Sequence, residues 1–308
     1  MSFYHIPVML QEAVEALNIK PGGVYVDGTA GGGGHSIEIA KRLSGGRLIS
    51  IDKDPQAVAA ASHRLSGYPQ ARVAQGDFAD LTDILDHLEL GGVDGVLLDL
   101  GVSSHQIDAP ERGFSYHLDA PLDMRMSGAG KSAAQLLNEA GERELVDIFR
   151  RYGEEKFAGR IAKNIVSERE IRPLATTYQL VGIIRESIPA AARREGGHPA
   201  KRVFQALRIA VNGELESLRA VLDTAFERLN PGGRFVTITF HSLEDRMVKQ
   251  AFAEFAKGCR CPSDFPVCVC GITPRGRLIG RKPVTASPRE LKENPRSKSA
   301  KLRAIEKL

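Results

Sequence analysis

Residues 24 to 36 are Val24-Tyr-Val-Asp-Gly-Thr-Ala-Gly-Gly-Gly-Gly-His-Ser36, an apolar strand that stops at a carboxylate and is followed by a glycine-rich turn. An apolar-periodic helix is predicted over residues 36–43, and a second strand, Arg47-Leu-Ile-Ser-Ile-Asp52, again ends in a carboxylate. The backbone of such a turn can approach a charged ligand at a helix N-terminus while the second carboxylate reaches a ribose. The alternative, a merely flexible glycine loop, does not account for the strand, helix and acidic strand end around it.

The glycines of this turn do not follow the dinucleotide-binding pattern G-x-G-x-x-G in any frame. Ser36 or Ile37 stands where the last glycine is required. That pattern serves to hold the pyrophosphate of a dinucleotide. The turn therefore favours S-adenosylmethionine, a cofactor that has a nucleoside and an amino acid but no pyrophosphate.

Strand and helix patterns alternate from residue 24 to residue 101, which predicts a parallel sheet with helices on both faces. The predicted strands are 24–27, 48–52, 71–74, 93–100 and 234–240, and the predicted helices between them are 36–43, 55–65 and 81–88. From 111 to 206 only helical patterns occur, and one long apolar-periodic segment runs from Phe204 to Leu229.

We therefore predict an α/β fold with a mostly parallel, doubly wound, Rossmann-like sheet, and a helical domain inserted into it. Residues 1–110 and 207–308 are expected to form the sheet domain, and residues 111–206 the inserted domain, with a role in substrate recognition. Residues 258–296 are expected to be irregular, and residues 300–305 to form a last edge strand.

The bulk composition favours a cytoplasmic protein with no membrane partner. The first twenty residues lack the basic-then-apolar architecture of a signal peptide, and no apolar run approaches the roughly 18 residues of a membrane helix. The net charge of +4 hides an asymmetry, because residues 257–308 hold 13 Lys and Arg against 4 Asp and Glu. This basic C-terminal arm indicates either contact with a polyanion such as nucleic acid or a solvated tail that aids solubility.

Ligands of an open parallel sheet bind at the carboxyl ends of its strands. Asp52 is the expected partner of ribose hydroxyls, and capping the helix that Pro55 begins is its alternative role. Phe78 follows the third strand, where its ring would stack on adenine or pack as an ordinary core residue. Asp99 follows the buried run Val-Leu-Leu, where a carboxylate is costly unless it faces a cleft, so we assign it a functional role.

Five further motifs, in order along the chain, carry a resemblance to a known family. They are Asp99-Leu-Gly-Val-Ser-Ser-His-Gln106, Glu111-Arg-Gly-Phe-Ser115, Pro121-Leu-Asp-Met-Arg-Met126, His198-Pro-Ala-Lys-Arg-Val-Phe-Gln-Ala-Leu-Arg208 and Phe240-His-Ser-Leu-Glu-Asp-Arg246. With them the chain closely resembles the bacterial 16S rRNA (cytosine-N4) methyltransferase family (RsmH/MraW). The match extends from His5-Ile-Pro-Val-Met-Leu to Asn294-Pro-Arg-Ser, which is essentially the whole chain.

The resemblance implies a class I S-adenosylmethionine-dependent methyltransferase fold that acts on a cytidine amino group in the decoding region of 16S rRNA. Carried over by motif position, the cofactor contacts are Gly33, Gly34, His35, Asp52, Phe78, Asp99 and Gln106. The assignment of Gln106 to the cofactor follows from the resemblance alone, since a lone glutamine in a polar loop is usually just solvated.

The chemistry points to Asp99 independently. The lone pair of cytosine N4 is delocalised into the ring, so a hydrogen-bond acceptor beside the amino group would favour a reactive nitrogen and accept its proton. Related amino-methylating enzymes stack the base on a Pro-Pro-aromatic segment at this strand end, whereas this chain has Leu-Gly-Val. Phe114, Tyr116 and Phe240 are the alternative stacking candidates.

Other polar residues of the motifs leave two interpretations open. His241 and Asp245 either line the target pocket or tie the helical insertion to the sheet, with Arg246 pairing an insertion carboxylate. Three further residues either contact phosphate or stabilise a helix junction. They are His198, Arg202 and Arg208.

Four cysteines are spaced Cys259-x-Cys261-x6-Cys268-x-Cys270 in a proline-rich segment. Four thiolates at this spacing suit tetrahedral zinc, although Cys-x-Cys is less usual than Cys-x-x-Cys. A redox-labile or simply packed loop is the alternative, the family resemblance does not require a metal, and we assign no metal from the sequence.

Two other functions stay open at this stage. One is methylation of a different amino substrate such as DNA, and the other is a non-catalytic RNA-binding assembly factor that has kept a cofactor fold. The sequence does not distinguish a monomer from a homodimer, or naked rRNA from an assembled small subunit as substrate.

Overall fold

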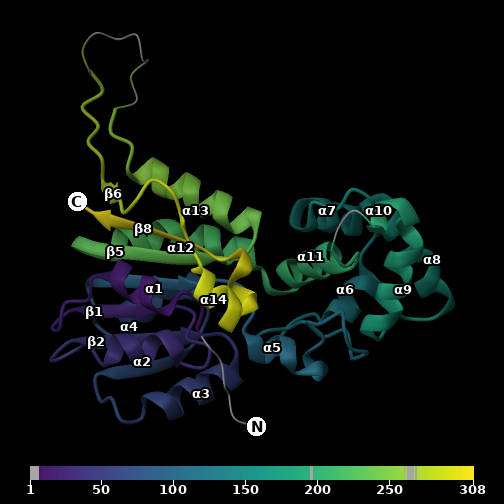
Figure 1. Ribbon diagram of the computed structural model, residues 1–308, viewed down its shortest axis with the longest axis horizontal. Helices are drawn as coiled ribbons and strands as arrows, with labels where there is room; N and C mark the ends of the chain where they lie inside the picture. The colour runs from purple at the N-terminus through teal and green to yellow at the C-terminus, as the bar shows by residue number, and fades with distance from the viewer. Residues whose placement is uncertain (1–6, 195–196, 260, 262–266, 268) are drawn as a thin grey trace. The chain divides into compact units, whose positions relative to one another are not determined.

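The computed structural model describes residues 7–194, 197–259, 261, 267 and 269–308 (Figure 1). It divides the chain into two compact units, one of Met1–Gly101 with Leu215–Leu308 and one of Val102–Glu214. No helix in the described part of the chain is long and apolar enough to cross a membrane.

The first unit contains one eight-stranded sheet in the order β3-β2-β1-β4-β5-β8-β6, with β7 also paired to β8. The strands are β1 Val24–Asp27, β2 Arg47–Asp52, β3 Ala71–Gln75, β4 Val93–Asp99, β5 Leu229–Thr239, β6 Gly276–Leu278, β7 Val284–Thr285 and β8 Lys301–Lys307. Strands β1 to β5 pair in parallel, and β8 runs antiparallel to β5. The prediction of a mostly parallel α/β sheet is confirmed.

Helices cover both faces of this sheet, because alternate residues of each buried strand point to opposite sides. On one face, Val96 and Leu98 of β4 pack in a core with α4 (Leu81–His87), α12 (Glu214–Arg228) and α13 (Ser242–Phe255). On the other face, Leu97 packs with α1 (Leu10–Leu17), α2 (Gly34–Ala40) and α3 (Pro55–Leu65). The sheet is therefore doubly wound.

Two predictions about the C-terminal segment are wrong in part. The strand expected over residues 300–305 exists as β8, but it lies inside the sheet between β5 and β6 and is not an edge strand. The segment expected to be irregular supplies β6, β7 and the helix α14 (Pro288–Glu293), which pack around β8. Strands of three and two residues are too short to show an alternating pattern.

The second unit is helical and has its own apolar core. Its helices are α5 Ser104–Asp108, α6 Ala133–Glu139, α7 Glu142–Gly153, α8 Ala158–Ile171, α9 Thr177–Ser187, α10 Ala190–Arg194 and α11 Lys201–Asn212. This unit begins at Val102 and ends at Glu214, whereas the sequence pattern set the domain boundaries at 111 and 206. The C-terminal boundary differs because α11 packs against α7 within the helical unit.

The long periodic segment from Phe204 to Leu229 is two helices. Gly213 adopts a φ of 60° and ends α11, and α12 begins at the next residue. Glycine reaches this left-handed conformation without the steric cost that a side chain adds. One apolar pattern thus continues across a break between the two compact units.

Candidate active site

Three carboxylates lie at the carboxyl ends of three adjacent strands. Asp27 ends β1, Asp52 ends β2 and Asp99 ends β4, and the sheet order places β1 between the other two strands. Since these strands are parallel, their carboxyl ends meet at one edge of the sheet. The predicted clustering of strand-end carboxylates is therefore present.

The glycine turn between β1 and α2 is fixed to these strand ends by backbone hydrogen bonds. The N–H of Gly28 donates to Leu97 O and that of Ala30 to Ile51 O, both at 2.9 Å. Gly33 has a φ of 76°, and a Cβ at Gly34 would lie 2.2 Å from Pro7 Cγ. Gly33 is therefore favoured by its left-handed backbone conformation, and Gly34 by the close packing of Pro7.

Asp52 anchors the same turn with its side chain. Its Oδ2 accepts a hydrogen bond from the Gly31 amide at 2.8 Å, and its Oδ1 accepts one from the Asp54 amide at 2.9 Å. Each carboxylate oxygen has a second lone pair, so the carboxylate can still accept one hydrogen bond from each of two ribose hydroxyls. Burial raises the pKa of Asp52 to about 6. The alternative capping role belongs to Asp54, whose side chain accepts from the Gln56 amide at the start of α3.

Asp99 has a buried carboxylate oxygen, Oδ1, with no hydrogen-bond partner in the described part of the chain. The side chain is 16% exposed. Burial raises the pKa of Asp99 well above its usual value, and the nearby negative charges of Asp27, Glu244 and Glu290 raise it further. An unpaired buried acceptor is costly, so this oxygen is suited to a donor that arrives with a ligand.

Thr29, which the sequence reasoning did not select, positions this residue. Its Oγ1 accepts a hydrogen bond from the Asp99 backbone amide at 2.6 Å and so ties the glycine turn to the end of β4. The sequence alone does not indicate this contact. A threonine two residues after the aspartate that ends β1 can be assigned to the end of β4 only when the two strands are known to be neighbours.

His35, at the beginning of α2, is buried beside Asp99. Its Nε2 lies 3.1 Å from Val8 O, and because a carbonyl oxygen only accepts, Nε2 carries the hydrogen. Nδ1, which then carries no hydrogen, lies 3.8 Å from Asp99 Oδ2. Burial lowers the pKa of His35 to about 4, so the ring is neutral at physiological pH.

This buried histidine gives a testable pH dependence. Because the pKa of His35 is about 4 when folded and about 6.5 when unfolded, its contribution to stability is complete above pH 6.5 and is lost as the pH falls towards 4. The variant His35→Gln keeps an N–H donor for Val8 O but does not titrate. Relative to it, the wild type should lose about 2 kcal/mol of unfolding free energy between about pH 7.5 and pH 5, measured by urea denaturation.

The pH profile of the wild type alone does not isolate His35, because the titration of Asp27 changes the unfolding free energy in the opposite direction. Burial raises the pKa of Asp27 to about 6, so its contribution is present below about pH 3.8 and is lost as the pH rises through 6. Asp27 is present in both proteins, and the difference between them isolates His35. Parallel stability profiles of the wild type and the variant would show that His35 is not held neutral by burial.

Phe78 and Gln106, the other two predicted cofactor residues, have defined structural partners. Phe78 follows β3 but is only 9% exposed and belongs to the core that includes Leu81 and Leu85. Gln106 lies in the helical unit, where its Oε1 accepts from the Ser103 amide in the capping box of α5. Contact of either residue with the cofactor stays a prediction.

The three candidates for stacking a base differ in their surroundings. Phe114 is 9% exposed and lies in the core of the helical unit. Tyr116 stacks on His198 with ring centroids 4.4 Å apart, so one ring face is already occupied. Phe240 follows β5 directly, and a Cβ at Gly101 would lie 3.6 Å from its ring. Of the two candidates in the helical unit, Tyr116 is the more accessible one.

His241 and Asp245 have structural partners within the sheet unit. His241 is the N-cap of α13 and forms a capping box with Glu244. Asp245 bonds Lys301 and Arg303 of β8 at 3.0 and 2.8 Å, and so ties α13 to the sheet. These two bonds of Asp245 stay within the sheet unit, and the choice between lining the target pocket and tying the insertion to the sheet stays a prediction.

Both arginines considered for phosphate binding make contacts within the helical unit. Arg208 forms a two-bond ion pair with Glu214, at 2.7 and 2.9 Å, across the break at Gly213. Arg202 donates to Glu154 O at 2.9 Å. For Arg208 the helix-junction role is supported by this pair.

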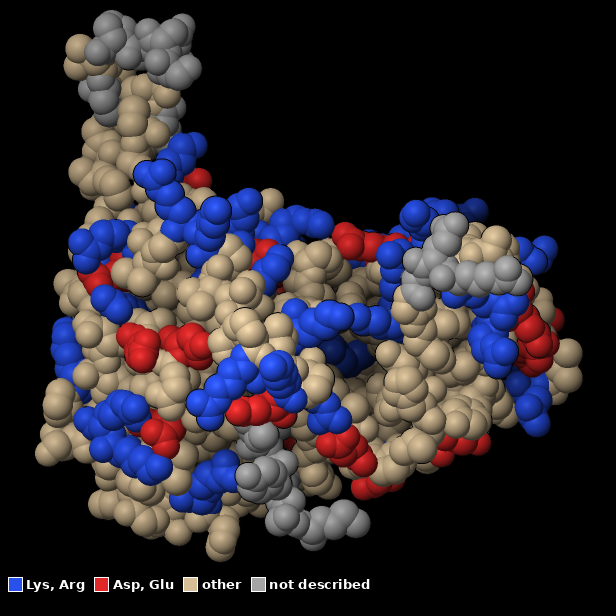
Figure 2. All heavy atoms as spheres, viewed as in Figure 1, with Lys and Arg blue, Asp and Glu red and all other residues tan. Residues whose placement is uncertain are grey.

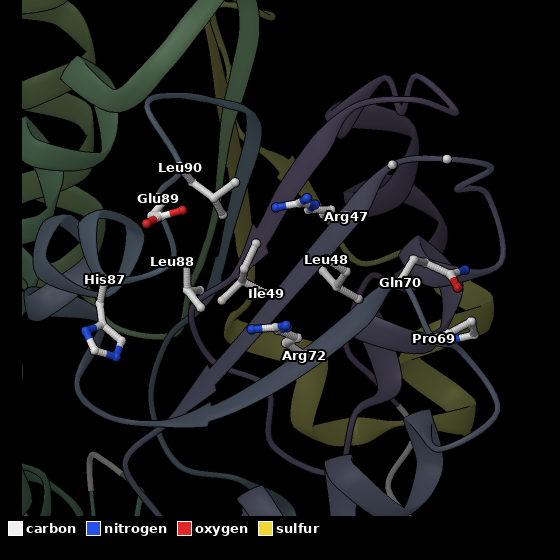
Figure 3. A pocket seen from close by; sticks show the side chains of 12 residues that line it. Arg47, Leu48, Ile49, Pro69, Gln70, Arg72, His87, Leu88, Glu89 and Leu90 are labelled. Atoms are coloured by element: carbon white, nitrogen blue, oxygen red, sulfur yellow. The ribbon is translucent and has the colours of Figure 1, made fainter.

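A hollow of about 510 Å³ lies elsewhere on the sheet unit (Figure 3). Its lining includes Arg47 and Arg72, near the beginnings of β2 and β3, and His87 at the end of α4. It therefore lies at the amino ends of these strands, away from the edge that carries Asp52 and Asp99. It is not part of the candidate active site.

Comparison with known proteins adds the last observation on this site. The sequence matches the MraW methylase family over residues 2–308. It is 57% identical over 311 residues to the "Ribosomal RNA small subunit methyltransferase H" of Symbiobacterium thermophilum, covering 100% of this chain and 98% of the relative. The protein of the same name from Heliobacterium modesticaldum is 55% identical over 312 residues, covering 100% of both chains.

Proposed function

Because the chain belongs to the MraW methylase family, we propose that it methylates the N4 amino group of a cytidine in the decoding region of 16S rRNA, with S-adenosylmethionine as methyl donor. The observation that carries this proposal is the buried carboxylate oxygen Oδ1 of Asp99 beside the glycine turn, which has no hydrogen-bond partner among the residues that the structure describes. The enzyme has the class I S-adenosylmethionine-dependent methyltransferase fold, a Rossmann-like α/β sheet.

The residues at the strand ends fit this cofactor. Asp52 offers lone pairs to the ribose hydroxyls, and the backbone at Gly33, Gly34 and His35 would hold the methionine portion. The carboxyl of Asp99 offers an acceptor to an ammonium or amino group at the same edge. When bound, the cofactor supplies an electrophilic methyl group on its sulfonium.

The residues of this chain then have two tasks, to position the base and to accept a proton. Holding the nitrogen in line with the methyl group supplies most of the acceleration. Asp99 accepts a hydrogen bond from the amino group and then the proton that N4 releases, a role that its raised pKa favours. Phe240, directly after β5 at the same edge of the sheet, is suited to contact the base.

Exposed cations support RNA as the substrate. Figure 2 shows Lys and Arg side chains gathered over α13, β6 and β8 of the sheet unit. The exposed members of this basic surface are Arg246, Lys249, Lys257, Arg275, Arg277, Arg281 and Lys282. Such a surface binds phosphates without reading sequence, and the helical unit is left to recognise the target. The enzyme would act in the cytoplasm, on the small ribosomal subunit or its rRNA.

Transfer of a labelled methyl group tests the proposal. Small subunits that lack the modification, naked 16S rRNA and duplex DNA are each incubated with enzyme and labelled S-adenosylmethionine, and nucleosides are identified by mass spectrometry. We expect N4-methylcytidine in one or both RNA substrates, with a yield that falls at high salt. Label in duplex DNA alone would favour a DNA methyltransferase, and binding without label in any substrate would favour a non-catalytic assembly factor.

A further inference from the structure

The segment between α13 and β6 brings three cysteines together. The Sγ atoms of Cys259, Cys261 and Cys270 all lie within 4.8 Å of one another. Within the described part of the chain, no disulfide joins any two of these three cysteines. Cys268, the fourth cysteine of the sequence pattern, lies outside the described residues.

The separation between the sulfurs of Cys259 and Cys270 matches that of two ligands of one metal ion and not that of a disulfide. Cys259 Sγ and Cys270 Sγ are 3.8 Å apart, far beyond the roughly 2.05 Å of a disulfide bond. A tetrahedral zinc ion with sulfur ligands at about 2.3 Å holds those sulfurs about 3.8 Å apart. In addition, the Cys261 amide donates a hydrogen bond to Cys259 Sγ at 3.3 Å, which stabilises negative charge on that sulfur.

The large apolar side chains among the described residues of this segment are exposed. They are Val267 at 70%, Val269 at 73% and Ile272 at 40%. A backbone hydrogen bond of 2.9 Å from the Arg275 amide to Phe255 O closes its base. Long irregular segments without a core commonly need a crosslink to hold one conformation, and a metal ion supplies one.

We propose that Cys259, Cys261 and Cys270 bind a zinc ion that stabilises this segment. Thiolates select soft or borderline metals, and this excludes magnesium and calcium, which prefer oxygen. Zinc accepts a fourth ligand from another side chain or water. The site contains none of the residues assigned to methyl transfer, so the zinc proposal does not depend on the proposed function.

Metal analysis of the whole protein tests the proposal. Protein purified without chelator under reducing conditions should contain about one zinc ion per chain by inductively coupled plasma mass spectrometry. The double variant Cys259→Ser with Cys270→Ser should contain only traces, and Val269→Ala, at an exposed position in the same segment, should retain the metal. Replacing zinc by cobalt should give the intense visible absorption of a tetrahedral cobalt–thiolate centre.

Two results would overturn the proposal. One is wild-type protein that holds only traces of zinc and does not take up zinc from a competing chromophoric chelator. The other is a zinc content that the double variant shares with the wild type. Circular dichroism of each variant tests whether the protein has folded. A loss of bound metal can then be distinguished from a loss of the fold.

Discussion

Replacing Asp99 with asparagine is expected to lower the turnover number for methyl transfer by roughly 10²- to 10⁴-fold, the usual contribution of a general base. The amide has the shape of the carboxyl group but cannot take the proton that N4 releases. Binding of the RNA should change little, because phosphate contacts provide most of that affinity. The measurement is single-turnover methyl transfer at saturating cofactor and RNA.

Asp94→Asn is the matched control, because Asp94 lies near the beginning of the same strand and accepts a hydrogen bond from the Val24 amide. It should retain the wild-type rate. The variant Asp99→Asn should also be no less stable than the wild type at pH 8, since burial makes the charged carboxylate costly there. Wild-type turnover in Asp99→Asn would exclude the residue as proton acceptor.

Replacing Asp52 with alanine is expected to weaken binding of S-adenosylmethionine by roughly 100-fold. A hydrogen bond to a charged acceptor contributes about 1.5–3 kcal/mol, and about 1.4 kcal/mol corresponds to a factor of ten in affinity. The variant also loses the bond to the Gly31 amide, which anchors the glycine turn. Both effects act on cofactor affinity, which isothermal titration calorimetry measures directly.

Asp54→Ala separates the ribose contact from general damage to this region. It removes the N-cap of α3 and should cost about 1 kcal/mol of stability, with little change in cofactor affinity. The two aspartates are two residues apart, and only Asp52 is assigned to the ribose. Equal affinities of Asp52→Ala and the wild type would contradict this assignment.

The sequence predicts secondary structure best in buried elements, because burial requires a regular pattern of apolar residues. The strands β1, β2, β4 and β5 are predicted because central parallel strands are apolar on both faces. By contrast, β6 and β7 are too short to show a period, and the break at Gly213 depends on a single backbone angle. The local pattern therefore predicted the strands β1 to β5 and β8, whereas the short strands β6 and β7 depend on tertiary pairing.

In the candidate site, too, some features can be predicted from the sequence and others cannot. The strand-end positions of Asp52 and Asp99 follow from the parallel topology. Their partners do not, because the Gly31 amide, Thr29 Oγ1 and Val8 O come together only through the folded turn. The helix-cap role of Gln106 also shows that one side chain can serve local structure while a family motif assigns it to a ligand.

The position of β8 has a consequence for how the chain folds as it is synthesised. Strand β8 follows every other described strand along the chain, yet it pairs with β5, β6 and β7 inside the sheet. Until it emerges from the ribosome, the long edge of β5 remains unpaired, and such an edge can pair with other chains. A nascent chain that stalls after α14 would therefore expose this edge and depend on chaperones to avoid aggregation.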